Sequence, residues 1–79
     1  MNQVVTVSVM SIHIPAMSTL GYGEGILVDE SGSYHVRFAG DHRPMRDIGE
    51  ALRDAKAPVN AEIAPHLILA MTLIEGAQA

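Results

Sequence analysis

Residues 25–39 have the pattern of two β-strands joined by a tight turn. Residues 25–30 are mostly apolar, the connection DESGS is polar and contains Gly32, and residues 34–39 alternate between apolar and polar side chains. A glycine in a short polar link between two such stretches is typical of a β-hairpin. The alternation predicts that the core-facing residues are Val28, Tyr34, Val36 and Phe38, and that the exposed residues are His35 and Arg37.

A first strand is predicted at residues 3–14, and its alternation changes phase partway along. The apolar residues are Val5, Val7 and Val9 before the change and Met10, Ile12 and Ile14 after it. A β-bulge, in which an extra residue bends the strand, produces such a change. Pro15 ends the strand because it has no N–H to donate to a ladder. We therefore expect a small, curled antiparallel sheet.

An amphipathic helix is predicted at residues 44–55, and a fourth strand at residues 59–64. Pro44 suits the first helical turn, and Asp41 is the expected side-chain acceptor at the helix N-terminus. The apolar stripe of the helix consists of Met45, Ile48, Leu52 and Ala55. The inward residues of the strand are Val59, Ala61 and Ile63. The fold class predicted from these elements is α+β.

The last segment, residues 65–75, is apolar almost throughout. Its central eight residues include a single polar one, Thr72. A helix is the first interpretation, and a strand over residues 59–69 is the alternative, because periodicity does not separate the two for short apolar runs. In the helical interpretation Leu69 and Leu73 point away from the core. The segment is therefore expected to offer an apolar contact surface.

Length and composition indicate a single domain, residues 1–79. No cysteine is present, which excludes disulfides and thiolate metal sites. Five Lys and Arg against nine Asp and Glu give a formal charge of −4, which argues against broad contact with a phosphate backbone. No basic residue precedes the first apolar stretch, and no apolar run reaches the roughly 18 residues of a membrane span. A cytoplasmic location without membrane contact is expected.

In residues 21–38, glycines alternate with other residues ahead of an apolar strand, a turn and a V-x-F strand. This pattern resembles the opening hairpin of small SH3-like barrels of the Tudor type. The matching residues are Gly23, Gly25, Ile26, Val28, Val36 and Phe38. The resemblance implies a partly open SH3-like barrel that binds proteins or nucleic acids rather than catalysing a reaction.

Gly21, Gly23 and Gly25 do not match a nucleotide-binding loop. The dinucleotide fingerprint is G-x-G-x-x-G between a strand and a helix, whereas these glycines form G-x-G-x-G ahead of a hairpin. We expect them to serve the backbone instead, by allowing positive φ angles and a tight bend.

Metal and catalytic sites are further alternatives that the sequence supports less well. The four histidines are scattered, at positions 13, 35, 42 and 66. Copper(I) is the metal that would suit a set formed by Met10, His13 and Met17. A base with an orienting carboxylate would come from the cluster Asp41, His42 and Arg43. We expect neither an enzyme nor a bound cofactor.

The sequence thus favours a non-enzymatic interaction module that docks on a partner protein or on itself as a homodimer. As a short, cysteine-free and mildly acidic chain, the protein is similar to the small accessory and inhibitor proteins of bacteria and phages. The expected contact residues are Leu69, Leu73, His35, Arg37, His42 and Arg43. The alternative is a small nucleic-acid-binding barrel with a basic edge formed by Arg37, Arg43, Arg46 and Arg53. Acidic residues interleave with these arginines, namely Asp41, Asp47, Glu50 and Asp54.

Overall fold

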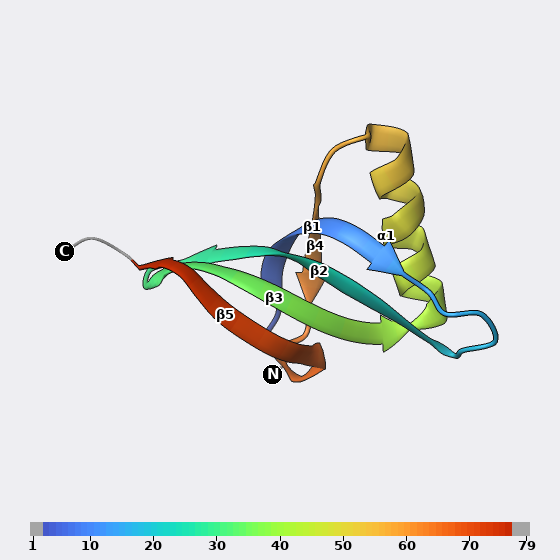
Figure 1. Cartoon of the computed structure of the whole chain (residues 1–79), viewed down its shortest axis with the longest axis horizontal. Helices are drawn as coiled ribbons and strands as arrows, with labels where there is room; N and C mark the ends of the chain where they lie inside the picture. The colour runs from blue at the N-terminus through green and yellow to red at the C-terminus, as the bar shows by residue number, and fades with distance from the viewer. Residues whose placement is uncertain (1–2, 77–79) are drawn as a thin grey trace.

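The computed structural model describes residues 3–76 and shows a five-stranded antiparallel sheet with one α-helix (Figure 1). The α+β prediction is confirmed. In chain order the elements are β1 (Val5–His13), β2 (Leu20–Asp29), β3 (Gly32–Asp41), α1 (His42–Ala55), β4 (Val59–Ile63), the 3-10 helix η1 (Pro65–Leu67) and β5 (Ile68–Gly76).

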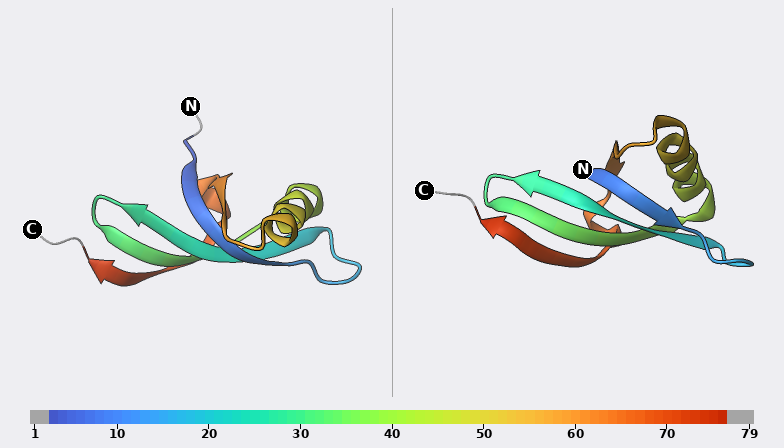
Figure 2. Two further views of the ribbon diagram at one scale, coloured as in Figure 1. Left: turned by 90° about the horizontal axis from the view of Figure 1, so that it is seen from above. Right: turned by 45° about the horizontal axis from the view of Figure 1, so that its top comes forward.

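The order of strands across the sheet is β4-β1-β2-β3-β5. The strands β4 and β5 form the two opposite edges, yet only residues 64–67 connect them along the chain. The sheet must therefore curl until its edges approach each other at this connection. The views in Figure 2 show the curl, with the β2–β3 hairpin and β5 extending beyond the helix. A closed SH3-like barrel is not confirmed, because no ladder joins β4 to β5 within residues 3–76.

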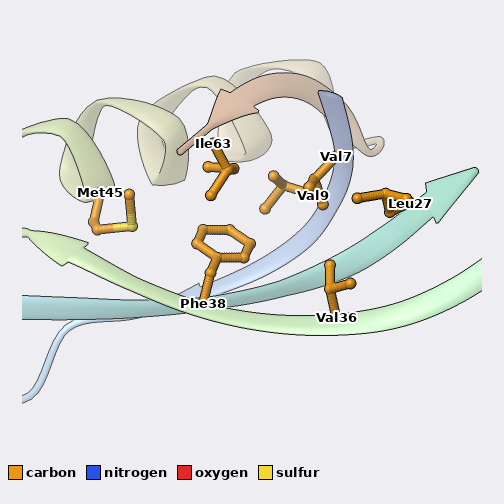
Figure 3. Packing of buried hydrophobic residues seen from close by; sticks show 7 residues of the cluster. All are labelled: Val7, Val9, Leu27, Val36, Phe38, Met45 and Ile63. Atoms are coloured by element: carbon orange, nitrogen blue, oxygen red, sulfur yellow. The ribbon is translucent and has the colours of Figure 1, made fainter. Parts of the chain in front are cut away.

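The core lies between the helix and the concave face of the sheet, which we call the inner face (Figure 3). Its buried apolar side chains come from β1, β2, β3, α1 and β4: Val7, Val9, Leu27, Val36, Phe38, Met45 and Ile63. The helix packs against β1, β2, β3 and β4. The core is thus concentrated at one end of the sheet.

The predicted bulge in the first strand is confirmed. The register between β1 and β2 shifts between Val9 and Ser11, so Met10 is the extra residue. The prediction that Met10 continues the apolar face is wrong, because the bulge turns its side chain outward and leaves it 52% exposed. After the bulge Ile12 returns to the core side of the strand and packs against the buried cluster.

The β2–β3 hairpin is also confirmed, but β2 begins at Leu20 rather than at residue 25. Its inward positions are occupied by Gly21, Gly23, Gly25 and Leu27, as the alternating burial pattern shows. Val28 is therefore on the other face and is 70% exposed, so its predicted burial is wrong. The burial of Val36 and Phe38 and the exposure of Arg37 are confirmed, whereas His35 is half-buried.

The predicted helix is confirmed and begins two residues earlier, at His42. Asp41 occupies the N-cap position, but its side chain makes no capping hydrogen bond. The backbone N–H of His42 instead donates to the carbonyl oxygen of Thr19, 2.9 Å away, in the loop between β1 and β2. At the other end Lys56 adopts a left-handed conformation, and its N–H donates to the Leu52 carbonyl oxygen.

The last segment is not a helix. It forms the short helix η1 and then β5, so the alternative of one strand over residues 59–69 is also wrong in its bounds. Without β5, one side of β3 would leave its N–H and C=O groups unpaired. The last segment forms hydrogen bonds with these groups when it is a strand, and its apolar run has no helical periodicity that favours a helix instead. The predicted fourth strand is confirmed as β4, with Ile63 buried and Asn60 and Glu62 exposed.

Candidate functional site

The glycines of β2 create space on the inner face of the sheet. A Cβ atom on Gly23 would lie 2.7 Å from Ile12 Cδ1 and would collide with the Phe38 ring, and one on Gly25 would overlap the carbonyl oxygen of Ser8. Among residues 3–76 the only glycine with a positive φ is Gly32, at 144°. The expected positive φ at the cluster is therefore wrong. These glycines let neighbouring strands and a core ring approach closely.

Strand β5 carries the most exposed apolar surface of the described chain. We call Leu69, Met71, Leu73 and Ile74 the β5 edge patch; their exposed fractions lie between 47% and 64%. The strand is an edge of the sheet, so one side of its backbone has no strand partner within residues 3–76. Such an edge is a template for pairing with another strand, and proteins usually protect it with charges or cover it.

Two bulges interrupt the pairing of β5 with β3. The register shifts at Leu69 and again at Ile74, and the stretch between them, residues 70–73, pairs without interruption with residues 34–37. Met71 faces Val36 and Leu73 faces Tyr34 across the ladder, so both lie on the inner face. They remain exposed because α1 covers the other end of the sheet (Figures 1 and 2).

The opposite edge of the sheet is less suited to docking. β4 is only five residues long, and its exposed side chains include Asn60 and Glu62. The helix also packs against it. A short strand with a charge and a neighbouring helix is a protected edge, so β5 is the more available of the two.

A hollow of about 390 Å³ lies on the outer face of the sheet, opposite the helix. It is lined by Ser11, His13, Pro15, Tyr22, Gly23, Glu24 and Arg37. The Ser11 hydroxyl donates to Glu24 Oε1 at 3.1 Å, and His35 Nε2 lies 3.2 Å from Glu24 Oε2. Glu24 is thus held from both sides, although Arg37 is its direct partner in the β2–β3 register.

The structure divides the sequence-predicted contact residues among three places. Leu69 and Leu73 lie on β5, His35 and Arg37 lie on the outer face of β3 next to it, and His42 and Arg43 begin the helix. Sequence reasoning missed Met71 and Ile74 as contact residues, because the helical interpretation assigned them to the buried stripe. It also missed the hollow, although Tyr22 and Glu24 alternate with the glycines and hence share one face.

The alternative metal site gains no support from the geometry. Within residues 3–76 no group of three or more His, Asp or Glu side chains is placed to hold a metal ion. Arg37 lies beside Tyr22 in the outer hollow, whereas the other three arginines lie on α1 with Asp47 and Glu50. No helix in the described part of the chain has the length and apolar character needed to cross a membrane.

Comparison with protein-family models, with curated proteins and with solved structures returned no match.

Proposed function

We propose that this chain is a non-enzymatic protein-interaction module that docks through β5, with an extended segment of its partner added to the sheet as a further strand. The observation that carries the proposal is an edge strand whose outer backbone side has no strand partner within residues 3–76 and which has four exposed apolar side chains, the β5 edge patch. In strand addition, backbone hydrogen bonds provide affinity and alternate side chains provide specificity.

The composition of β5 supports this role. Residues 68–74 contain no charged side chain, and Glu75 is the only one in the strand. Charged edge residues normally prevent unwanted pairing, so a strand that lacks them is suited to a wanted contact. Apolar patches exposed on this scale are typical of sites that bind other proteins.

The finer features of the proposal follow from the sequence. An accessory or inhibitor protein of bacterial or phage type, acting in the cytoplasm, is consistent with a small, cysteine-free, mildly acidic chain. The resemblance of residues 21–38 to SH3-like barrels favours the same class of activity, because such barrels mostly bind other macromolecules.

Nucleic-acid binding is the less favoured alternative. Its support is that Arg37 and Tyr22 both line the outer hollow, where a base could stack. The remaining arginines lie on the helix, interleaved with acidic residues, and the formal charge of the chain is −4. Without a continuous basic surface, contact with a phosphate backbone gains little.

The test compares two double variants in partner capture. Leu69→Glu with Leu73→Glu places charges on β5, and Met10→Glu with Val28→Glu places the same charges at other exposed apolar positions. We expect proteins captured by the wild type from its native host to be lost with the first variant and kept with the second. In the complex, hydrogen exchange should slow at the β5 amides.

Two results would contradict docking through β5. One is capture that survives the β5 variant, and the other is protection from exchange confined to another surface. Equal loss of capture in both variants would also count against the proposal, because general stickiness of exposed apolar residues would then explain the binding.

A further inference from the structure

We infer that the partner strand of β5 is the β5 strand of a second copy of this chain, arranged antiparallel across a twofold axis that passes beside Thr72. The inference rests on the proposed function, since it names the occupant of the same docking edge. It makes one continuous sheet from the sheets of two protomers.

The bulges of β5 limit which strands can pair with it. Only residues 70–73 present a regular ladder, because the register is interrupted at Leu69 and Ile74. A long regular partner strand would run past these bulges and leave N–H and C=O groups unpaired. A second β5 has the same short regular stretch, so residues 71–73 of the two copies can pair with each other before either strand reaches a bulge.

The faces of the sheet determine the register of this pair. Residues directly opposite each other in an antiparallel ladder point to the same face. An axis at Thr72 places Met71 opposite Leu73 of the second copy, and Leu73 opposite Met71. Both side chains lie on the inner face and are 47% and 57% exposed in the isolated chain. An axis at Thr72 places the small residue Ala70 opposite the bulge at Ile74 of the second copy, whereas an axis at Met71 would place Leu73 opposite the bulge at Leu69.

Charge selects the antiparallel arrangement over a parallel one. Glu75 is the only charged residue of β5. About an axis at Thr72 it lies near Leu69 of the second copy, whereas a parallel in-register pair would place the two Glu75 carboxylates side by side. Like charges directly opposite each other destabilise a strand pair.

The size of this contact indicates a weak dimer. A short ladder and the β5 edge patch form an interface smaller than the roughly 800 Å² per partner of a standard stable complex. We therefore expect a dissociation constant on the order of micromolar. The exposed edge then serves as a reversible contact.

The absence of cysteine from the chain allows a sharp test of the register. The axis at Thr72 brings its two Cα atoms to roughly 4.5–5.5 Å, within the range that a disulfide spans. With oxidised glutathione as the oxidant, we expect Thr72→Cys to form a disulfide-linked dimer at least about tenfold faster than Ala51→Cys, because local concentration is raised in the dimer. Ala51 is exposed on the helix and serves as the control.

Adding Leu73→Glu to Thr72→Cys should reduce its rate of cross-linking to that of the control. If circular dichroism shows that Thr72→Cys is unfolded, the wild type and Leu73→Glu are compared by analytical ultracentrifugation instead. We expect the wild type to dimerise and Leu73→Glu to remain a monomer. A wild type that stays monomeric at about 1 mM, well above a micromolar dissociation constant, overturns the self-pairing. Equal cross-linking rates for the two cysteine variants do the same. Docking of β5 on a different protein would still be judged by the capture experiment.

Discussion

Phe38 and Leu73 lie on neighbouring strands and face the same side of the sheet, yet Phe38 is 0% exposed and Leu73 is 57% exposed. Both side chains are apolar, so hydrophobicity does not explain the difference. The covered end of the sheet has α1 packed over its inner face, and the open end, formed by β5 and the hairpin tip, extends beyond the helix (Figures 1 and 2).

The contrast shows how little surface one helix can cover. α1 has 14 residues, which makes it roughly 21 Å long at 1.5 Å per residue. The largest dimension of the chain is 46 Å. A small domain with one helix therefore leaves part of its sheet open, and apolar side chains on that part are available for contact with another molecule.

The largest difference between the two ends is expected for large-to-small substitutions. Phe38→Ala should reduce the free energy of unfolding by about 3–5 kcal/mol, because it leaves a cavity in the buried cluster. Leu73→Ala should change it by less than about 1 kcal/mol, as is usual for exposed positions. Urea denaturation followed by circular dichroism measures both values. Similar losses for the two variants would show that the open end is covered in the isolated chain.

Replacing a glycine by alanine should lower the stability of the protein where the added Cβ atom has no space and raise it where there is space. At the covered end, Gly25→Ala forces a Cβ atom against the carbonyl of Ser8, and such overpacking costs about 1–3 kcal/mol. Gly49→Ala on the helix meets Ile12 only at 3.6 Å, an ordinary contact distance. It should stabilise the protein by up to about 1 kcal/mol through helix propensity. Thermal melts compare the two, and a stabilised Gly25→Ala would refute the close approach of the strands.

At the open end, charges should be tolerated by the isolated chain. Leu69→Glu combined with Leu73→Glu is expected to lower the free energy of unfolding by no more than about 1 kcal/mol, because both side chains are exposed. Val36→Glu, which buries a carboxylate in the core, should unfold the protein. Circular dichroism distinguishes the outcomes. Unfolding of the β5 double variant would mean that these leucines belong to the core.

The covered end was largely predictable from the sequence. The alternation around Val36 and Phe38, the phase change at Met10 and the helical stripe through Met45 all follow from local periodicity, which reflects the side that each residue turns to the core. The prediction for Val28 was wrong because three of the inward positions of β2 are glycines. Glycine is not an apolar marker of the buried face, so the sequence of β2 did not show which of its residues point inward.

The open end was not predictable in the same way. β5 is apolar on both of its faces, and its two bulges disturb the alternation, so periodicity did not separate strand from helix. Its conformation depends on the free edge of β3, a long-range partner that local sequence does not specify. The expectation that Leu69 and Leu73 are exposed is confirmed, although the expected helix is wrong.

The smallest expected effect concerns Asp29, at the hairpin turn of the open end. Hydrogen bonds from the hydroxyl and the N–H of Ser31, and from the N–H of Gly32, lower the pKa of Asp29 below its ordinary value of 3.8. A lowered pKa in the folded state means that the stabilisation is present above pH 3.8 and is lost as the pH falls through the folded value.

Amide exchange at Ser31 and Gly32 should therefore accelerate in acid, whereas exchange at Phe38 should follow global stability. Asp29→Ala should remove the local acid response and leave the core unchanged. A titration by NMR that places the pKa of Asp29 at or above 3.8 would contradict this account of the turn.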